Sequence, residues 1–154
     1  MYKSIDIAAQ IIKLSNEIGE PITNMKLQKL IYYVYAWYAV EKGKPLFDEP
    51  IYAWKYGPVI ASVYRAYQKF GADVIKESVD GDPESIDDYT KKLIEEVFNI
   101  YGTKSAIDLM ELTHSEAPWR DTYKPGDDTQ IPFNLIQSYY KARKDLAENS
   151  NVKK

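Results

Sequence analysis

The chain contains no cysteine, one histidine (His114) and no long uncharged hydrophobic run among its 154 residues. Without cysteine there can be no disulfide, thiol nucleophile, iron–sulfur cluster or cysteine-bound zinc, and nothing suggests secretion. A membrane span would need about 20 predominantly apolar residues in a row, and no segment supplies them. We therefore expect an untargeted protein that works in the cytoplasm, with no membrane partner.

Basic residues are also too few for a general nucleic-acid-binding face. The 20 Lys and Arg are outnumbered by 23 Asp and Glu, for a formal net charge of −3. Because neutralising phosphates requires a positively charged surface, we expect no direct binding of nucleic acid. Glycine-rich phosphate loops are absent as well. Tyrosine, by contrast, is abundant, with 14 residues beside 3 Trp and 4 Phe, and its amphipathic ring suits surfaces that are buried in one state and wet in another.

Apolar residues at helical spacing predict several helices. The first is expected to be capped by Ser4 and to end at Gly19, because glycine is the usual residue just beyond a helix. The second is expected to begin at Thr23 or Asn24 and to run to Gly43. Apolar residues go most of the way round this second helix, which is typical of a helix at the centre of a bundle or at an interface.

A short β element is predicted where residues 51–57 alternate between the two faces of a strand. Gly57 and Pro58 are expected to end this strand and to start a helix, because proline suits the first helical turn. Residues 74–80 are the candidate second strand, since a lone strand would leave its backbone groups unpaired.

Serines and prolines mark the later helices. Ser85 and Ser105 each precede an acidic residue by three positions, which is the capping-box pattern at a helix start. Pro118 should break the helix that Ser105 begins, because the residue before a proline avoids helical geometry. A last helix should follow Pro132.

Together these elements predict a mainly α fold of about six helices with a minor short antiparallel β element. One domain of about 100–200 residues is the usual expectation for a chain of this length. We expect a single compact domain over residues 1–148 and a frayed C-terminal tail over 149–154.

The chemistry available around His114 is limited. Glu111, Glu116 and Asp121 lie near it in the sequence and would allow a metal site, or a metal-dependent hydrolase centred on His114. The alternative is a structural imidazole at a helix C-terminus, where it meets the helix dipole and a backbone carbonyl. We favour the structural role and expect no catalytic residue, no metal and no cofactor.

Aromatic residues are the stronger candidates for function. Five rings fall within residues 32–38, too many to point inward together, so part of them should form an exposed apolar patch of the kind that marks a binding site, beside others that form the core. Trp54 and Tyr56 should lie at a rim, and both residue types are common anchors of protein interfaces. The expected contact residues are Tyr33, Trp37, Trp54, Tyr56, Gly57, Pro58, His114, Glu116 and Trp119.

Three segments of the chain match a known family. They are MKLQKLIYYVYAWYAVEKGKPLFDEPIYAWKYGPVIASVYRAY at 25–67, YGTKSAIDLMELTHSEAPW at 101–119 and IQSYY at 136–140. In the first, KLQKL with paired tyrosines, GKPLF and AWKYGPV occur in that order, and the LTH-x-E-x-PW block of the second is an independent match. On these motifs the chain resembles the Panacea, or SocA-like, antitoxin domain family of bacteria and their phages.

The resemblance implies a mostly helical, non-enzymatic module that neutralises a toxin encoded beside it by direct protein contact. Toxins paired with this family belong to unrelated classes, including alarmone-synthetase-like toxins and others that act on RNA or translation. One branch of the family instead delivers its toxin to a AAA+ protease, so a proteolytic adaptor is the alternative, and a homodimer also stays open. The family carries no catalytic, ligand or cofactor residues over to this chain.

Overall fold

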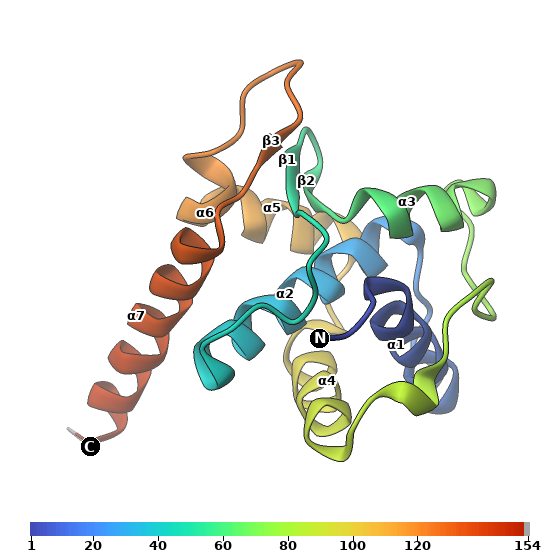
Figure 1. The fold of residues 1–154 in the computed structure, drawn as a ribbon, viewed down its shortest axis with the longest axis horizontal. Coiled ribbons are helices and arrows are strands. Elements are labelled where there is room, and N and C mark those ends of the chain that lie inside the picture. The colour runs from blue at the N-terminus through green and yellow to red at the C-terminus, as the bar shows by residue number, and fades with distance from the viewer. Residues whose placement is uncertain (153–154) are drawn as a thin grey trace.

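Helices make up most of the chain in the structure, a computed structural model that describes residues 1–152 (Figure 1). Within that range there are seven α-helices, two short 3-10 helices and one small antiparallel sheet, which confirms the mainly α fold. The helices are α1 (Ser4–Ile18), α2 (Asn24–Lys42), α3 (Ala61–Tyr67), α4 (Asp88–Tyr101), α5 (Ala106–Ser115), α6 (Ala117–Arg120) and α7 (Phe133–Val152), with η1 (Gln68–Phe70) and η2 (Pro83–Ser85). The strands are β1 (Tyr52–Trp54), β2 (Gly57–Val59) and β3 (Thr129–Gln130).

The C-terminal tail expected at 149–154 lies partly outside the described residues, which end at 152, and the backbone of α7 continues to Val152. Over the described range, no helix combines the length and the apolar content that a bilayer crossing requires.

Helix α2 lies at the centre of the fold, in contact with α1, α3, α4, α5, α7 and β2 (Figure 1). Its start is confirmed at Thr23, whose hydroxyl accepts a hydrogen bond from the backbone N–H of Lys26. Its end is confirmed at Gly43, which adopts a left-handed φ of 70° and donates its N–H to the carbonyl of Ala39. Because neighbours surround α2 on all sides, its nearly all-round apolar character is explained by burial.

The expectation of an exposed aromatic patch on residues 32–38 is wrong. Tyr32, Tyr33, Tyr35 and Tyr38 are all buried, and only Trp37 is half-exposed. The rings find partners on other helices, as where Tyr33 stacks on Tyr101 of α4 with ring centroids 4.0 Å apart. A central helix can direct rings inward on several sides at once, and this possibility was underestimated from the sequence.

The sheet also differs from the prediction. Gly57 and Pro58 do not end a strand and begin a helix: after a two-residue turn they form β2, which pairs with β1 so that Ala53 lies opposite Pro58. The strand order β2-β1-β3 places β2 at the edge, where proline's missing N–H costs no ladder bond. Residues 74–80 form no strand, and β1 pairs on its other side with β3 instead.

Two of the three predicted serine caps are wrong. Ser4 is the first residue of α1, after Lys3 at the cap position, and its hydroxyl instead bonds the carboxylate of Glu49. Ser85 lies in η2, and the cap of α4 is Asp87. Ser105 does cap α5, accepting the backbone N–H of Asp108 at 3.0 Å.

Candidate functional site

The β1–β2 hairpin forms one wall of a cavity of about 580 Å³. The opposite walls come from the first turns of α2, from α3 and from the start of α5, so segments far apart in the sequence meet here. The lining is mostly apolar, and the side chains used below are Met25, Lys29, Trp54, Tyr56, Tyr64 and Ile107.

The rim of this cavity carries exposed apolar side chains. Tyr56, in the hairpin turn, is 54% exposed, and Ile107, on the first turn of α5, is 60% exposed. Trp54 is half-buried between them and the interior, with its ring edge-on to Tyr64 at 5.4 Å and near-parallel to Tyr52 at 6.3 Å. Packing on both sides holds the Trp54 ring in place, so this part of the rim is preorganised.

Lys29 of α2 lies in the cavity wall with only 1% of its surface exposed. Its amine donates to the backbone carbonyl of Pro58 at 3.4 Å, and burial lowers the pKa of this amine to about 7. The close contact between the hairpin backbone and the Lys29 side chain depends on glycine at position 57, because a Cβ there would lie 2.3 Å from Lys29 Cε. The hairpin therefore covers a buried lysine that is readily neutral near physiological pH.

His114 and Trp119 join α5 and α6 to the hairpin. The Trp119 indole N–H donates to the backbone carbonyl of Trp54 at 2.7 Å, and the Trp119 ring stacks on His114 at 3.8 Å between centroids. Burial and the nearby Lys29 charge lower the pKa of His114, although a backbone hydrogen bond with Lys55 and the Glu111 carboxylate act in the other direction. The predicted break near Pro118 is short, because the chain resumes as α6 at Ala117 with this proline in its first turn.

Glu116 forms a buried network with three tyrosines. Its Oε1 accepts hydrogen bonds from the hydroxyls of Tyr33 at 2.6 Å and Tyr140 at 2.9 Å, and the Tyr140 hydroxyl lies 3.1 Å from that of Tyr32. Burial raises the pKa of the Glu116 carboxyl, and the two phenol hydrogen bonds partly oppose that shift. Tyr33 and Glu116 thus connect α2, α7 and the α5–α6 junction inside the protein, and they present no surface to a partner.

The acidic residues around His114 do not converge on it. Glu116 faces the tyrosines, and Asp121 pairs with Arg120 at 3.0 Å. Among the side chains that the structure describes, those of residues 1–146, no group of three or more His, Asp or Glu is placed to hold a metal ion.

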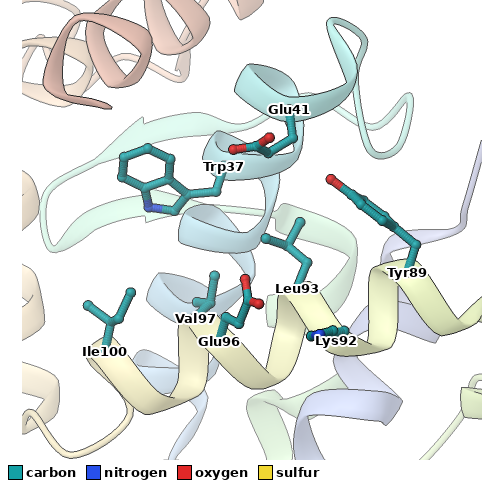
Figure 2. Close-up of a pocket in the computed structure, with 8 residues that line it drawn as sticks. All are labelled: Trp37, Glu41, Tyr89, Lys92, Leu93, Glu96, Val97 and Ile100. Carbon is teal, nitrogen blue, oxygen red and sulfur yellow. The ribbon is translucent and has the colours of Figure 1, made fainter. Parts of the chain in front are cut away.

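Trp37 lies in a different hollow, of about 390 Å³, between α2 and α4. Figure 2 shows Trp37 and Glu41 on α2 facing side chains of α4. The Trp37 indole N–H donates to the hydroxyl of Tyr101 at 3.0 Å, and the exposed Tyr89 and Ile100 border the hollow. Trp37 therefore does not share a surface with Trp54.

Of the nine expected contact residues, the structure brings the hairpin residues together with His114 and Trp119, and leaves Trp54 and Tyr56 as the accessible members beside the cavity. Trp119, Gly57 and Pro58 are buried beneath them. Sequence reasoning missed Lys29, Met25 and Tyr64. A lysine on a helix that is apolar on most sides was the available signal for Lys29.

Comparisons with known proteins identify the family of the chain. The family model described as "Antitoxin SocA-like, Panacea domain" matches residues 27–120, which span α2 through α6. Antitoxin SocA from Caulobacter vibrioides (strain NA1000 / CB15N) is 33% identical over 140 residues, covering 84% of this chain and 74% of the relative. No solved structure matches the chain. With more than half of its residues matched by that model, the chain belongs to the SocA-like, Panacea-domain antitoxin family.

Proposed function

We propose that this protein neutralises a cognate protein toxin in the cytoplasm by binding it directly, without catalysis. The contact would be made by the hairpin surface, which we define as Met25, Trp54, Tyr56 and Ile107 around the mouth of the 580 Å³ cavity. Family membership supports the antitoxin role. The observation that carries the choice of surface is the pair of exposed apolar side chains, Tyr56 and Ile107, that flank one hollow from two different elements.

The hairpin surface has the properties of an energetic hot spot. Trp and Tyr are enriched among interface anchors, and they supply contact area with little loss of rotamer freedom. Trp54 is already held by Tyr52 and Tyr64, so ordering it on binding costs little. The hollow beside these rings offers a place for a side chain of the toxin, which is how anchors and pockets pair in protein interfaces.

The test compares two double variants made entirely from exposed residues. Tyr56→Ala with Ile107→Ala removes the exposed part of the hairpin surface, and we expect it to weaken binding to the toxin encoded beside this chain by at least about tenfold. Tyr89→Ala with Ile100→Ala removes exposed apolar area from the α2–α4 hollow of Figure 2 and should leave affinity nearly unchanged. If the Tyr89→Ala, Ile100→Ala variant instead lost more toxin affinity than the Tyr56→Ala, Ile107→Ala variant, the toxin-binding surface would be the α2–α4 hollow.

Growth rescue and toxin lifetime test the mode of neutralisation. Co-expression should restore growth, yield a complex that co-purifies, and leave the half-life of the toxin unchanged or longer. Rescue with a shortened toxin half-life and no complex would contradict sequestration and support delivery to a AAA+ protease.

A further inference from the structure

The buried amine of Lys29 lacks a counter-charge. Among the described residues no carboxylate lies within ion-pair distance of it, and its contact with the Pro58 carbonyl is long for a hydrogen bond, at 3.4 Å. An amine that can donate three hydrogen bonds is thus left with one weak acceptor. Burying such a group without partners is costly, so an acceptor brought in from outside would bind favourably.

A second donor in the same cavity is also unsatisfied. Trp54 lines the cavity, and its indole N–H is buried with no acceptor in the part of the chain that the structure describes. Since buried polar groups in proteins are nearly always hydrogen-bonded, the unpartnered indole N–H and the weakly bonded lysine beside one cavity point to a missing acceptor.

The rest of the cavity is suited to an apolar group. Met25, Val59, Tyr64 and Ile107 line it, and the volume of about 580 Å³ lies within the range of small-molecule sites. Such sites combine mostly apolar walls with a few polar groups that fix the orientation of the ligand. The combination found here is an apolar hollow with a cationic or hydrogen-bond-donating side.

We propose that this cavity binds a small monocarboxylate with an apolar body. The carboxylate accepts hydrogen bonds from Lys29 Nζ and Trp54 Nε1, and the apolar body lies against Met25, Tyr64 and Ile107. Hydrogen bonds between charged partners are about twice as strong as neutral ones, so the lysine supplies most of the selectivity for a carboxylate. This ligand site shares Met25, Trp54 and Ile107 with the hairpin surface and differs from it in using the buried Lys29.

The proposal makes binding depend on pH. In the free protein the Lys29 amine loses its proton near pH 7, and only the ammonium form pairs well with a carboxylate. The titratable groups on the elements around it are His114 on α5, Lys55 and Tyr56 in the hairpin turn, and Tyr64 on α3. Burial and the Lys29 charge lower the pKa of His114 below its usual value, so this group titrates at lower pH than Lys29. The apparent Kd should therefore rise by a factor on the order of 100 between pH 6 and pH 9.

Isothermal titration with 4-phenylbutyrate, and with the neutral 4-phenylbutan-1-ol as its analogue, tests the site in the full chain. The carboxylate should bind with the pH dependence given above, and the alcohol should bind much more weakly. Lys29→Met should weaken carboxylate binding by about 10- to 100-fold at pH 6. The matched control is Lys55→Met, which removes an exposed lysine from the same cavity and should change the affinity by less than about threefold.

A second variant keeps the test decisive if Lys29→Met does not fold. Trp54→Phe retains an aromatic ring but removes the indole N–H with part of the ring area, so it should weaken 4-phenylbutyrate binding by about 3- to 10-fold more than it weakens binding of the alcohol. The proposal is overturned if 4-phenylbutyrate does not bind at millimolar concentration, or if the alcohol binds equally well. It is also overturned if the affinity is independent of pH. Because Lys29 is buried and is not part of the hairpin surface, Lys29→Met should lose 4-phenylbutyrate binding and keep toxin binding, which distinguishes a failure of this site from a failure of the proposed function.

Discussion

The indole N–H of Trp119 donates a 2.7 Å hydrogen bond to the backbone carbonyl of Trp54 and thereby ties α6 to strand β1. These two residues are 65 positions apart in the sequence, and their contact positions the hairpin over Lys29 and His114. The hairpin surface and the cavity beneath it both depend on this connection.

Replacing Trp119 should therefore destabilise the protein and loosen the hairpin. We expect Trp119→Phe to lower the free energy of unfolding by about 1–3 kcal/mol, because it removes the donor to a part-buried carbonyl and part of the stacked ring area on His114. Urea unfolding measures the change. Tyr123→Phe, which retains the ring stacked on the other face of Trp119, is the control and should change stability by less than about 0.5 kcal/mol.

Gly57→Ala should be costly for two separate reasons. The residue has a φ of 114°, which side chains rarely adopt, and the new Cβ would lie 2.3 Å from Lys29 Cε. We expect a loss of about 2–5 kcal/mol. Gly126→Ala measures the cost of the positive φ without a steric clash, because that residue has a φ of 81° and no atom lies within 4 Å of a new Cβ. Equal losses in the two variants would show that the close approach to Lys29 contributes nothing.

Lys29 should make stability rise with pH above neutrality. Its folded-state pKa of about 7 lies below the ordinary value of 10.5, so between these values the unfolded chain binds a proton that the folded protein lacks. Stability then increases with pH by at most about 1.4 kcal/mol per unit in this window. Lys29→Met should be more stable than the parent at pH 7, by a margin that shrinks toward pH 9. Urea unfolding at both pH values measures it, and a margin that does not change with pH would contradict the buried-lysine account.

Glu116 can be replaced by an amide but not by an apolar residue. Gln offers the same carbonyl oxygen to the hydroxyls of Tyr33 and Tyr140, so we expect Glu116→Gln to stay within about 1 kcal/mol of the parent. Glu116→Leu leaves the Tyr33 hydroxyl without its acceptor and leaves Tyr140 with only the Tyr32 hydroxyl, so it should cost about 2–4 kcal/mol. Thermal or urea unfolding ranks the variants, and equal stability of Gln and Leu would mean that the network contributes little.

The helix ends were predictable where the signal and its partner lie within one turn of chain. Thr23, Ser105, Gly19 and Gly43 act on backbone groups a few residues away, so their roles were evident from the sequence. Ser4 did not follow the rule, because Glu49, 45 positions away, bonds its side chain in the folded protein.

Part of the candidate site was predictable for a different reason. Trp54, Tyr56, His114 and Trp119 stood out by residue type, and the structure gathers all four around the hairpin. Residue type does not, however, indicate how deeply a side chain is buried. Tyr33 and Glu116 looked equally suitable and are buried in a network with α7.

The amino-acid order alone determined the mainly helical class, the central helix over 24–42 and the family, because these depend on local spacing and on contiguous motifs. Tertiary structure alone decided which aromatic rings face solvent, which strand pairs with β1, and that Lys29 is enclosed in the wall of a cavity beside the unpartnered indole N–H of Trp54. Those outcomes depend on contacts between segments tens of residues apart. Burial and pairing are properties of the assembled neighbours of a residue, and no local pattern specifies them.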